Sequence, residues 1–323
     1  MYYAIRHQTK FRYAEPVRES IMEVRLQPRT EWTQHCLSFD MQVTPRCRVL
    51  QYRDHLDNMV HHFSIPGRSD RLSIVTTSLV QVQPFQAWPE SLDAAAWEQI
   101  DALTAEGDYH EMLLPSAFAH PTPLLAELAV SLHVTRRDDP MTVLRDINRS
   151  ICEGFEYVPK STRVDSSLDD ALRARQGVCQ DFAHIMIALV RLLRIPCRYV
   201  SGYVAPGEFT PERAAAGYAS HAWVEAWLPG CGWVGFDPTN SRLVEERHVR
   251  CAIGRDYADV PPTKGVYKGD HRAEMNVHVL VKPTEAGAKP ELEFTFPILE
   301  EWMAQEQTAA LPSEFDLAHS QQQ

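Results

Sequence analysis

Three runs of sequence decide the fold: QGVCQDFAH at residues 176–184, SHAWVEAW at residues 220–227 and GWVGFDPT at residues 232–239. Gly177 precedes a segment with apolar residues at helical spacing, which places Cys179 in the first turn of a helix. The N–H groups of a first turn stabilise a thiolate and can donate hydrogen bonds to an oxyanion beside the sulfur. A cysteine in this position needs a base, and the base needs an acceptor that fixes its tautomer.

Two histidines are candidates for that base. His184 lies five residues after Cys179, about 140° around the helix, so a place in the core is the better interpretation. His221 begins an alternating strand, and Asp237 ends the next strand. A three-residue loop between these strands would set Asp237 opposite Trp223 and diagonal to His221, within reach of its side chain. A four-residue loop without a bulge would put the histidine and the aspartate on opposite faces, so the pairing depends on register.

Three further residues are weaker candidates for the oxyanion site or the cleft. Tyr157 could supply a second oxyanion donor, but packing in the core would explain it at least as well. Gln180 could line the oxyanion site or simply cap a helix turn. Trp223 could form a wall of the cleft, although aromatic residues on strands lie more often in the core. The adjacent histidines at 61–62 have no third ligand at useful spacing, so the sequence predicts neither a metal nor another cofactor.

Composition excludes several classes of protein. The 323 residues are 44% hydrophobic, which predicts a real core, and the length fits two domains. The net charge is −11 without a Lys/Arg block, which argues against a nucleic-acid partner. No apolar run reaches the ~18–20 residues of a spanning helix, and the charged N-terminus lacks the apolar core of a signal peptide, so we expect no membrane association. Seven cysteines without a C-x-x-C pair fit a reducing cytoplasm and argue against structural zinc.

The pattern of elements divides the chain. Strands are predicted over 2–13, 19–26, 37–43, 49–53, 59–65 and 72–82, with turns such as Pro66-Gly67 between them. Helices are predicted over 92–103, 122–133, after an N-cap at Asp139, and over 179–193, followed by strands over 197–204, 221–228, 233–237 and 276–281. We therefore expect a β domain at 1–85, a linker with a helix at 86–120, and a core with a C-terminal strand extension at 121–283. The tail at 284–323 has no assignment.

Together the three opening runs resemble the core of the transglutaminase-like superfamily, a papain-like fold with Cys, His and Asp in that chain order. The run YVSGY at 199–203 is also similar. Residues 1–85 resemble the N-terminal β domain of a bacterial branch through HQT at 7–9, RLQPR at 25–29 and the pair Asp54 and Asn58. GRDYADVPP at 254–262 matches the same branch. The resemblance covers roughly residues 1–283 and implies an α+β protein with an antiparallel β-sandwich domain before the papain-like core.

The resemblance implies a thiol acyl-transfer enzyme. Cys179 would attack a carboxamide or peptide carbonyl, His221 would act as base and then acid, and Asp237 would orient His221. The thioester would pass to water in an amidase or peptidase, which is the preferred activity, or to an amine in a protein-glutamine transamidase. A non-catalytic peptide-binding scaffold is the alternative from another class.

The resemblance also bears on partners. We expect a peptide or an amide-containing small molecule as substrate, and the bacterial branch suggests ATP-grasp proteins encoded nearby as partners. Animal relatives use calcium, but no D-x-D-x-D-G loop occurs in this chain, so calcium independence is expected. The sequence leaves the oligomeric state open.

Overall fold

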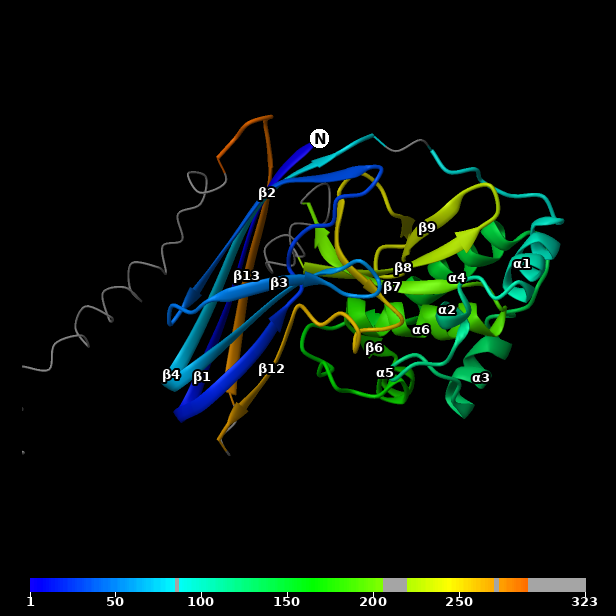
Figure 1. Cartoon of the computed structure of the whole chain (residues 1–323). Coiled ribbons are helices and arrows are strands. Elements are labelled where there is room, and N and C mark those ends of the chain that lie inside the picture. The colour runs from blue at the N-terminus through cyan, green and yellow to red at the C-terminus, as the bar shows by residue number, and fades with distance from the viewer. Residues whose placement is uncertain (85–86, 206–219, 270–272, 290–323) are drawn as a thin grey trace, which may run out of the picture. The chain divides into compact units, whose positions relative to one another are not determined.

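The computed structural model describes residues 1–84, 87–205, 220–269 and 273–289 (Figure 1). The strands that precede the first helix are β1 (Tyr2–Val24), β2 (Gln34–Thr44), β3 (Val49–Arg53) and β4 (Met59–Val82). The helices are α1 (Ala96–Ala105), α2 (His110–Leu113), α3 (Pro123–Ser131), α4 (Pro140–Gly154), α5 (Leu168–Ala174) and α6 (Cys179–Leu192). The later strands are β5 (Glu156–Tyr157), β6 (Gln176–Gly177), β7 (Cys197–Val204), β8 (Ser220–Leu228), β9 (Gly232–Asp237), β10 (Arg242–Leu243), β11 (His248–Gly254), β12 (Thr263–Lys268) and β13 (Ala273–Thr284). The predicted α+β class is confirmed.

The N-terminal strands are longer and fewer than predicted. Residues 2–13 and 19–26 lie mostly in one strand, β1, and residues 59–65 and 72–82 lie in one strand, β4. Pro66-Gly67, predicted as a turn, falls inside β4. The two strands pair antiparallel along nearly their whole length, with register shifts between Arg12 and Val17 and between Arg18 and Ser20. Such irregularities let a paired strand bend and twist without ending, so local turn residues do not interrupt the ladder.

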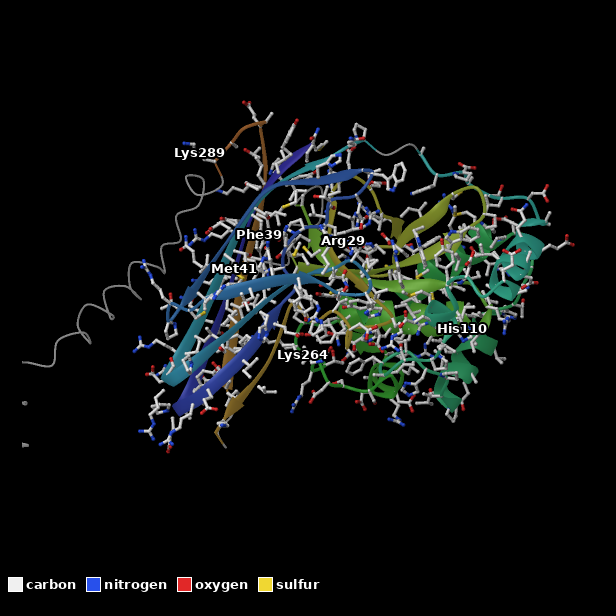
Figure 2. The ribbon with its side chains drawn as sticks, viewed as in Figure 1. Arg29, Phe39, Met41, His110, Lys264 and Lys289 are labelled. Atoms are coloured by element: carbon white, nitrogen blue, oxygen red, sulfur yellow. The ribbon has the colours of Figure 1, made fainter. Side chains whose placement is uncertain are left out.

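Hydrogen bonds join the described N-terminal strands in one antiparallel sheet of order β12-β1-β4-β2, in which β13 also pairs with β1 and β3 with β4. The apolar interior of this sheet draws on both halves of β1, through Tyr13 and Met22, and on both halves of β4, through Phe63 and Ile74. Met41 of β2, labelled in Figure 2, packs against the same cluster. This arrangement gives the N-terminal region a hydrophobic core of its own.

The prediction has one strand, over 276–281, in an extension of the core at 121–283, whereas the structure has two strands in this part of the chain, β12 and β13. β13 pairs with the first half of β1, from Tyr2 opposite Thr284 to Tyr13 opposite Ala273. β12 pairs with its second half, as far as Val24 opposite Thr263. Both strands therefore complete the N-terminal sheet. This pairing joins residues more than 230 positions apart in sequence, and a local pattern of apolar residues cannot specify such a distant partner.

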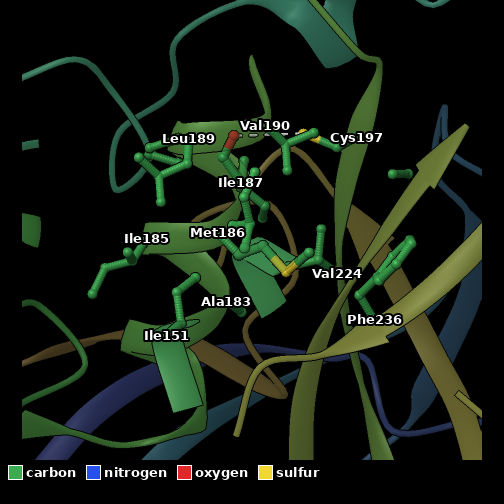
Figure 3. Packing of buried hydrophobic residues seen from close by; sticks show 14 of the residues in the cluster. Ile151, Ala183, Ile185, Met186, Ile187, Leu189, Val190, Cys197, Val224 and Phe236 are labelled. Carbon is green, nitrogen blue, oxygen red and sulfur yellow. Dashed lines mark hydrogen bonds between the residues drawn. The ribbon is translucent and has the colours of Figure 1, made fainter. Parts of the chain in front are cut away.

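A second antiparallel sheet, of order β10-β9-β8-β7-β11, lies in the core region. Figure 3 shows α6 packed beside it, with Ile187 and Met186 directed toward Val224 of β8 and Phe236 of β9. These side chains are fully buried, and burying each contributes up to about 1.5–3 kcal/mol. The contacts fix the helix against the sheet, and with it the helix N-terminus.

The linker is tied to the helical core by a cap. Asp139, predicted as the N-cap of the helix that follows it, accepts hydrogen bonds from the N–H groups of Met141 at 2.9 Å and Thr142 at 3.2 Å, which confirms the prediction. The same carboxylate oxygen accepts from the N–H of Leu92 at 2.8 Å. One buried side chain thus starts α4 and holds the linker segment before α1 in place.

No helix among the described residues is both long enough and apolar enough to cross a membrane. The tail that had no assignment starts at the last residue of β13, and its residues 290–323 lie outside the described part of the chain.

Candidate active site

The candidate nucleophile stands at the start of the most buried helix. Cys179 is the first residue of α6, and Val178 before it has an extended backbone. The first hydrogen bond of the helix runs from the N–H of Phe182 to the carbonyl of Val178 at 3.1 Å. The N–H groups of Cys179 and Gln180 precede that bond and lie at the positive end of the helix dipole. Cys179 as a residue is half-buried.

Asp181 fixes the turn that holds this cysteine. Its carboxylate, 5% exposed, accepts hydrogen bonds from the N–H of Val178 at 2.8 Å and from the hydroxyl of Thr162 at 2.6 Å. A Cβ at Gly177 would lie only 2.9 Å from the Asp181 carboxylate, so glycine leaves the room that this cap needs. Burial raises the pKa of Asp181, and the hydrogen bonds from Thr162 and Val178 oppose that rise. Asp181 therefore supports the helix start.

The register between β8 and β9 brings the predicted histidine and aspartate together. Leu228 pairs with Gly232, which leaves a three-residue loop, and Val224 pairs with Phe236. This is the odd register that the sequence required, and it sets Asp237 diagonal to His221. Nε2 of His221 lies 2.9 Å from Oδ2 of Asp237. The predicted register is confirmed.

Asp237 is fully buried and surrounded by donors. Besides His221, Oδ2 accepts from the amide of Asn240 at 2.7 Å and lies 3.4 Å from Nε2 of His248. Oδ1 accepts from the N–H of Thr239 at 3.0 Å. Burial alone would raise the pKa of Asp237, but the charge and hydrogen bonds of the surrounding groups, His221 first, hold it well below its usual range. The carboxylate is therefore ionised and held in one orientation.

His221 connects this carboxylate to the sulfur. Because Nε2 faces Asp237, the other ring nitrogen is the one that remains to face the thiol of Cys179, which hydrogen-bonds the ring. Burial alone would lower the pKa of His221, but Asp237 and then the hydrogen bond and charge of Cys179 raise it to about 10. The ring is therefore charged at neutral pH. Its side chain is 10% exposed, so the imidazole meets solvent only along a narrow edge.

Trp223 does not form an open wall of the cleft, which corrects that part of the prediction. Its side chain is fully buried and meets the ring of His248 edge-on at 5.2 Å between centroids, with the His221 ring at 6.3 Å. A Cβ at Gly202 of β7 would lie 2.6 Å from the indole, so that glycine makes room for the ring. The tryptophan thus supports both imidazoles from the core.

Tyr157 and Gln180, the two candidates for the oxyanion site, differ in their contacts. Tyr157 pairs in parallel with Gly177, two residues before the cysteine, and is half-buried, so it stays a candidate donor. The amide of Gln180 donates to the carbonyl of Val164 at 3.2 Å. That bond engages Gln180 with the loop before α5.

His184 is confirmed as a core histidine. It is 3% exposed, its ring stacks on Phe118 at 5.3 Å, and Nε2 accepts from the N–H of Tyr257 at 3.2 Å. Burial lowers its pKa to about 3, so it is neutral at physiological pH. Among the two histidines considered as a base, the structure brings only His221 to the sulfur.

One group among the described residues has donor atoms close enough to hold a metal ion. The ligand atoms of His221, Asp237 and His248 lie within 4.8 Å of one another, and imidazole nitrogens with a carboxylate oxygen suit a zinc-type ion. Both Nε2 atoms already lie at hydrogen-bond distance from Oδ2. A metal ion would have to replace those N–H···O contacts, so we interpret the group as a hydrogen-bonded cluster.

Two members of this cluster, Asn240 and His248, are not among the residues predicted from the sequence. Asn240 follows Asp237 by three residues in the run DPTN, and an Asn at the end of such a run is a turn signal that could have been noticed. His248 gives no local signal. It reaches the carboxylate because β11 pairs with β7 on the far side of β8 and β9.

Comparisons with known proteins agree with this geometry. The model of the transglutaminase-like superfamily matches residues 128–238, and that of the bacterial transglutaminase-like N-terminal region matches residues 3–81. An uncharacterized protein of Mycobacterium leprae, ML0607, is 31% identical over 84% of this chain and 95% of its own length. The uncharacterized protein Rv2569c of Mycobacterium tuberculosis is 32% identical over 88% of this chain and 94% of its own.

A crystal structure described as "a Putative Cysteine Protease" from Cytophaga hutchinsonii has the same fold. Its TM-score is 0.68 at 24% identity, and the match covers 88% of this chain and 92% of that one. The protein-glutamine gamma-glutamyltransferase of Pseudomonas aeruginosa is 31% identical over 57% of this chain and 27% of its own length. The matches to both family models, and to relatives of which the match covers 94–95%, show that this chain belongs to the transglutaminase-like superfamily and carries its bacterial N-terminal region.

Proposed function

We propose that this chain is a thiol acyl-transfer enzyme that cleaves an amide, peptide or isopeptide bond through a thioester on Cys179. The observation that carries the proposal is the hydrogen-bonded series from the Cys179 thiol through the His221 ring to the Asp237 carboxylate. A thiol nucleophile needs this order of groups, because the imidazole moves the proton and the carboxylate fixes the imidazole.

The chemistry follows from the atoms that face one another. The Cys179 thiolate attacks the carbonyl carbon and forms the C–S bond, and the N–H groups at the start of α6 donate to the developing oxyanion. The His221 imidazolium gives its proton to the leaving nitrogen, and the C–N bond breaks. Water then attacks the thioester, His221 takes the proton from that water, and the C–S bond breaks to release the acid. Tyr157 is our candidate for a second oxyanion donor.

Electrostatics supports the first step. His221 is positively charged beside the sulfur, and the sulfur also lies at the positive end of α6. Both features stabilise a thiolate, the reactive form of cysteine. The seven cysteines are all free, which supports a reducing compartment as part of the proposal.

Alkylation tests the proposal directly. Iodoacetamide at pH 6 should modify Cys179 selectively, and His221→Gln should slow that modification strongly. Cys231 is a matched control because it is also half-buried, while burial raises the pKa of its thiol. Cys231→Ser should therefore leave the labelling unchanged and Cys179→Ser should remove it. Equal labelling of the half-buried cysteines, unaffected by His221→Gln, would leave the scaffold alternative.

Transamidation is the second candidate. The named activity of the Pseudomonas aeruginosa relative, a protein-glutamine gamma-glutamyltransferase, favours it, although the matched region is only 27% of that protein. A glutamine peptide incubated with a fluorescent amine separates the two activities. We expect ammonia release without incorporation of the amine. Incorporation that depends on Cys179 would make the transamidase the better assignment.

A further inference from the structure

A second imidazole contacts the carboxylate of Asp237. His248 is the first residue of β11 and is 3% exposed. Its Nε2 lies 3.4 Å from Oδ2 of Asp237, the oxygen that His221 contacts at 2.9 Å. Neither family resemblance nor motif drew attention to this residue, and the thiol chemistry described above does not use it.

The hydrogen-bond network assigns the tautomer of His248. Its Nδ1 accepts from the N–H of Glu245 at 3.2 Å, so this nitrogen carries a lone pair. In a neutral imidazole the other nitrogen then carries the hydrogen, and Nε2 donates to Asp237. Burial lowers the pKa of His248, against the opposing effect of Asp237, so the ring is neutral at physiological pH. His248 is thus a neutral donor, whereas His221 on the same oxygen is a charged one.

The strand that carries His248 is held from outside the catalytic sheet. β11 is an edge strand of that sheet. The amide of Gln34 accepts from the N–H of Arg250 at 2.8 Å and donates to its carbonyl at 2.9 Å. The amide of Asn58 does the same for Ile253, at 2.8 Å for both bonds. The N-terminal region therefore completes the edge of β11 and fixes the position of His248.

We infer that His248 is a positioning residue: its neutral N–H fixes the Asp237 carboxylate and, through it, the His221 ring that serves the sulfur. This inference rests on the proposed function. His248 does not touch the sulfur, and with Asn240 and Thr239 it surrounds the carboxylate with donors. Without it the carboxylate would lose one of its orienting bonds, and the imidazole would sample orientations that do not serve the thiol.

The test compares two substitutions at this site in the full-length protein. His248→Gln keeps an amide N–H near the position of Nε2, while His248→Phe fills the volume without a donor. We expect His248→Phe to lower kcat on a fluorogenic peptide amide by about 10- to 100-fold with little change in KM. His248→Gln should recover most of that loss. His61→Phe is the matched control, since His61 is 5% exposed in the N-terminal sheet and packs on Phe39.

A second measurement does not depend on substrate. The Nε2–H proton of His221, bonded to Asp237, should resonate far downfield in the NMR spectrum. It should broaden or move upfield in His248→Phe but not in His248→Gln or His61→Phe. An unchanged resonance and unchanged kcat in His248→Phe would overturn the positioning role, and so would an equal loss in the folded His248→Gln protein. A wild-type protein that is inert toward acyl substrates, yet shows the resonance change, would refute the proposed function and leave the positioning role standing.

Discussion

Two fully buried carboxylates lie on neighbouring strands of the catalytic sheet, and their surroundings differ in kind. Glu225 on β8 is contacted by the guanidinium groups of Arg250 at 2.5 Å and Arg198 at 2.7 Å. Asp237 on β9 is contacted chiefly by the imidazoles of His221 and His248. A guanidinium keeps its charge at all relevant pH values, whereas an imidazole gains and releases protons. Equal burial therefore gives a fixed ion cluster in one place and, in the proposed function, a proton-handling cluster in the other.

The pKa values express the same contrast. Burial raises the pKa of Glu225, but the charges of Arg250 and Arg198 outweigh burial and lower the pKa to about 2. Glu225 is therefore ionised at physiological pH. In the other cluster Asp237 raises the pKa of His221, and His221 in turn lowers the pKa of Asp237. A strong pKa shift alone does not separate the two sites, but the kind of partner does.

Both clusters depend on β11. His248 and Arg250 stand two residues apart on that strand, so they lie on one face of it. One reaches Asp237 and the other reaches Glu225. The N-terminal sheet holds β11 through side-chain amides, and Glu31 adds a contact to Arg250 at 3.6 Å. A role of the N-terminal region in supporting the catalytic sheet follows from these bonds.

The largest effect is expected from breaking the proton-handling cluster. Asp237→Asn keeps the shape but cannot stabilise an imidazolium, so kcat should fall by about 10³–10⁴-fold with little loss of folded protein. The measurement is turnover of a peptide amide together with thermal unfolding. Asp256→Asn is the control, because Asp256 is also buried and its carboxylate accepts hydrogen bonds from the loop N–H groups of Phe118 and Ala258. Equal activity losses in both variants would contradict a special role of Asp237.

Breaking the ion cluster around Glu225 should lower the free energy of unfolding. Glu225→Gln removes the buried counter-charge that Arg250 and Arg198 share and leaves Arg250 with Glu31 at 3.6 Å, so the free energy of unfolding should fall by about 3–5 kcal/mol. Urea unfolding measures this loss, and the folded fraction should keep a reactive Cys179. Glu31→Gln, at the more exposed edge of the cluster, should cost at most about 1 kcal/mol. A stable Glu225→Gln protein with low kcat would remove the distinction between the two carboxylates.

Removing hydrogen bonds that hold β11 should affect both the Asp237 cluster and the Glu225 cluster, but by less than the substitutions of Asp237 and Glu225. Asn58→Ala leaves the N–H and carbonyl of Ile253 without these buried partners and should cost about 1–3 kcal/mol of unfolding free energy. Arg29, labelled in Figure 2, also donates to Asn58 and would lose that bond. A smaller decrease in kcat should accompany the loss through His248. Gln42→Ala on the exposed surface of β2 serves as the control and should change neither quantity.

The smallest expected effect, counted per pH unit, is a change in stability with pH. This change differs between the Asp237 cluster and the Glu225 cluster. The pKa of His221 is raised to about 10, so its stabilising contribution is fully present below the unfolded value near 6.5 and is lost as the pH rises through about 10. The slope is at most about 1.4 kcal/mol per pH unit. The contribution of Glu225, whose pKa is lowered to about 2, is present above its unfolded value and is lost only as the pH falls through about 2.

Urea unfolding of the wild type and His221→Gln between pH 6 and 10 isolates the first contribution. The two stability curves should converge toward pH 10. Parallel curves over that range would mean that the His221 ring is not charged in the folded protein at neutral pH.

Several elements could be predicted from sequence because their signals are local. The helix predicted over 179–193 ends one residue earlier, at Leu192, and the strand predicted over 197–204 has those bounds. Asp139 was identified as an N-cap because the aspartate and the following proline define a helix start by themselves. For His221 and Asp237 the sequence left a three-residue and a four-residue loop open, and the structure has the three-residue loop that brings the two side chains together.

Other features depended on long-range pairing. The merging of strands into β1 and β4, and the return of β12 and β13 to the N-terminal sheet, follow from partners far away in sequence. Trp223 was a candidate for the cleft because an alternating strand has two faces and the pattern does not say which face is covered. The structure covers that face with Val244 and Ile253, which places the indole in the core.

The sequence by itself determined the chemistry at the start of α6 and the helix that presents it, and it left two registers open between the strands of His221 and Asp237. Only the tertiary structure decided what surrounds the two buried carboxylates. His248 and Arg250 arrive on an edge strand whose place is set by β7 on one side and by amides of the N-terminal region on the other. The physical reason is that hydrogen bonds between distant strands carry no periodicity that a local stretch of chain could record.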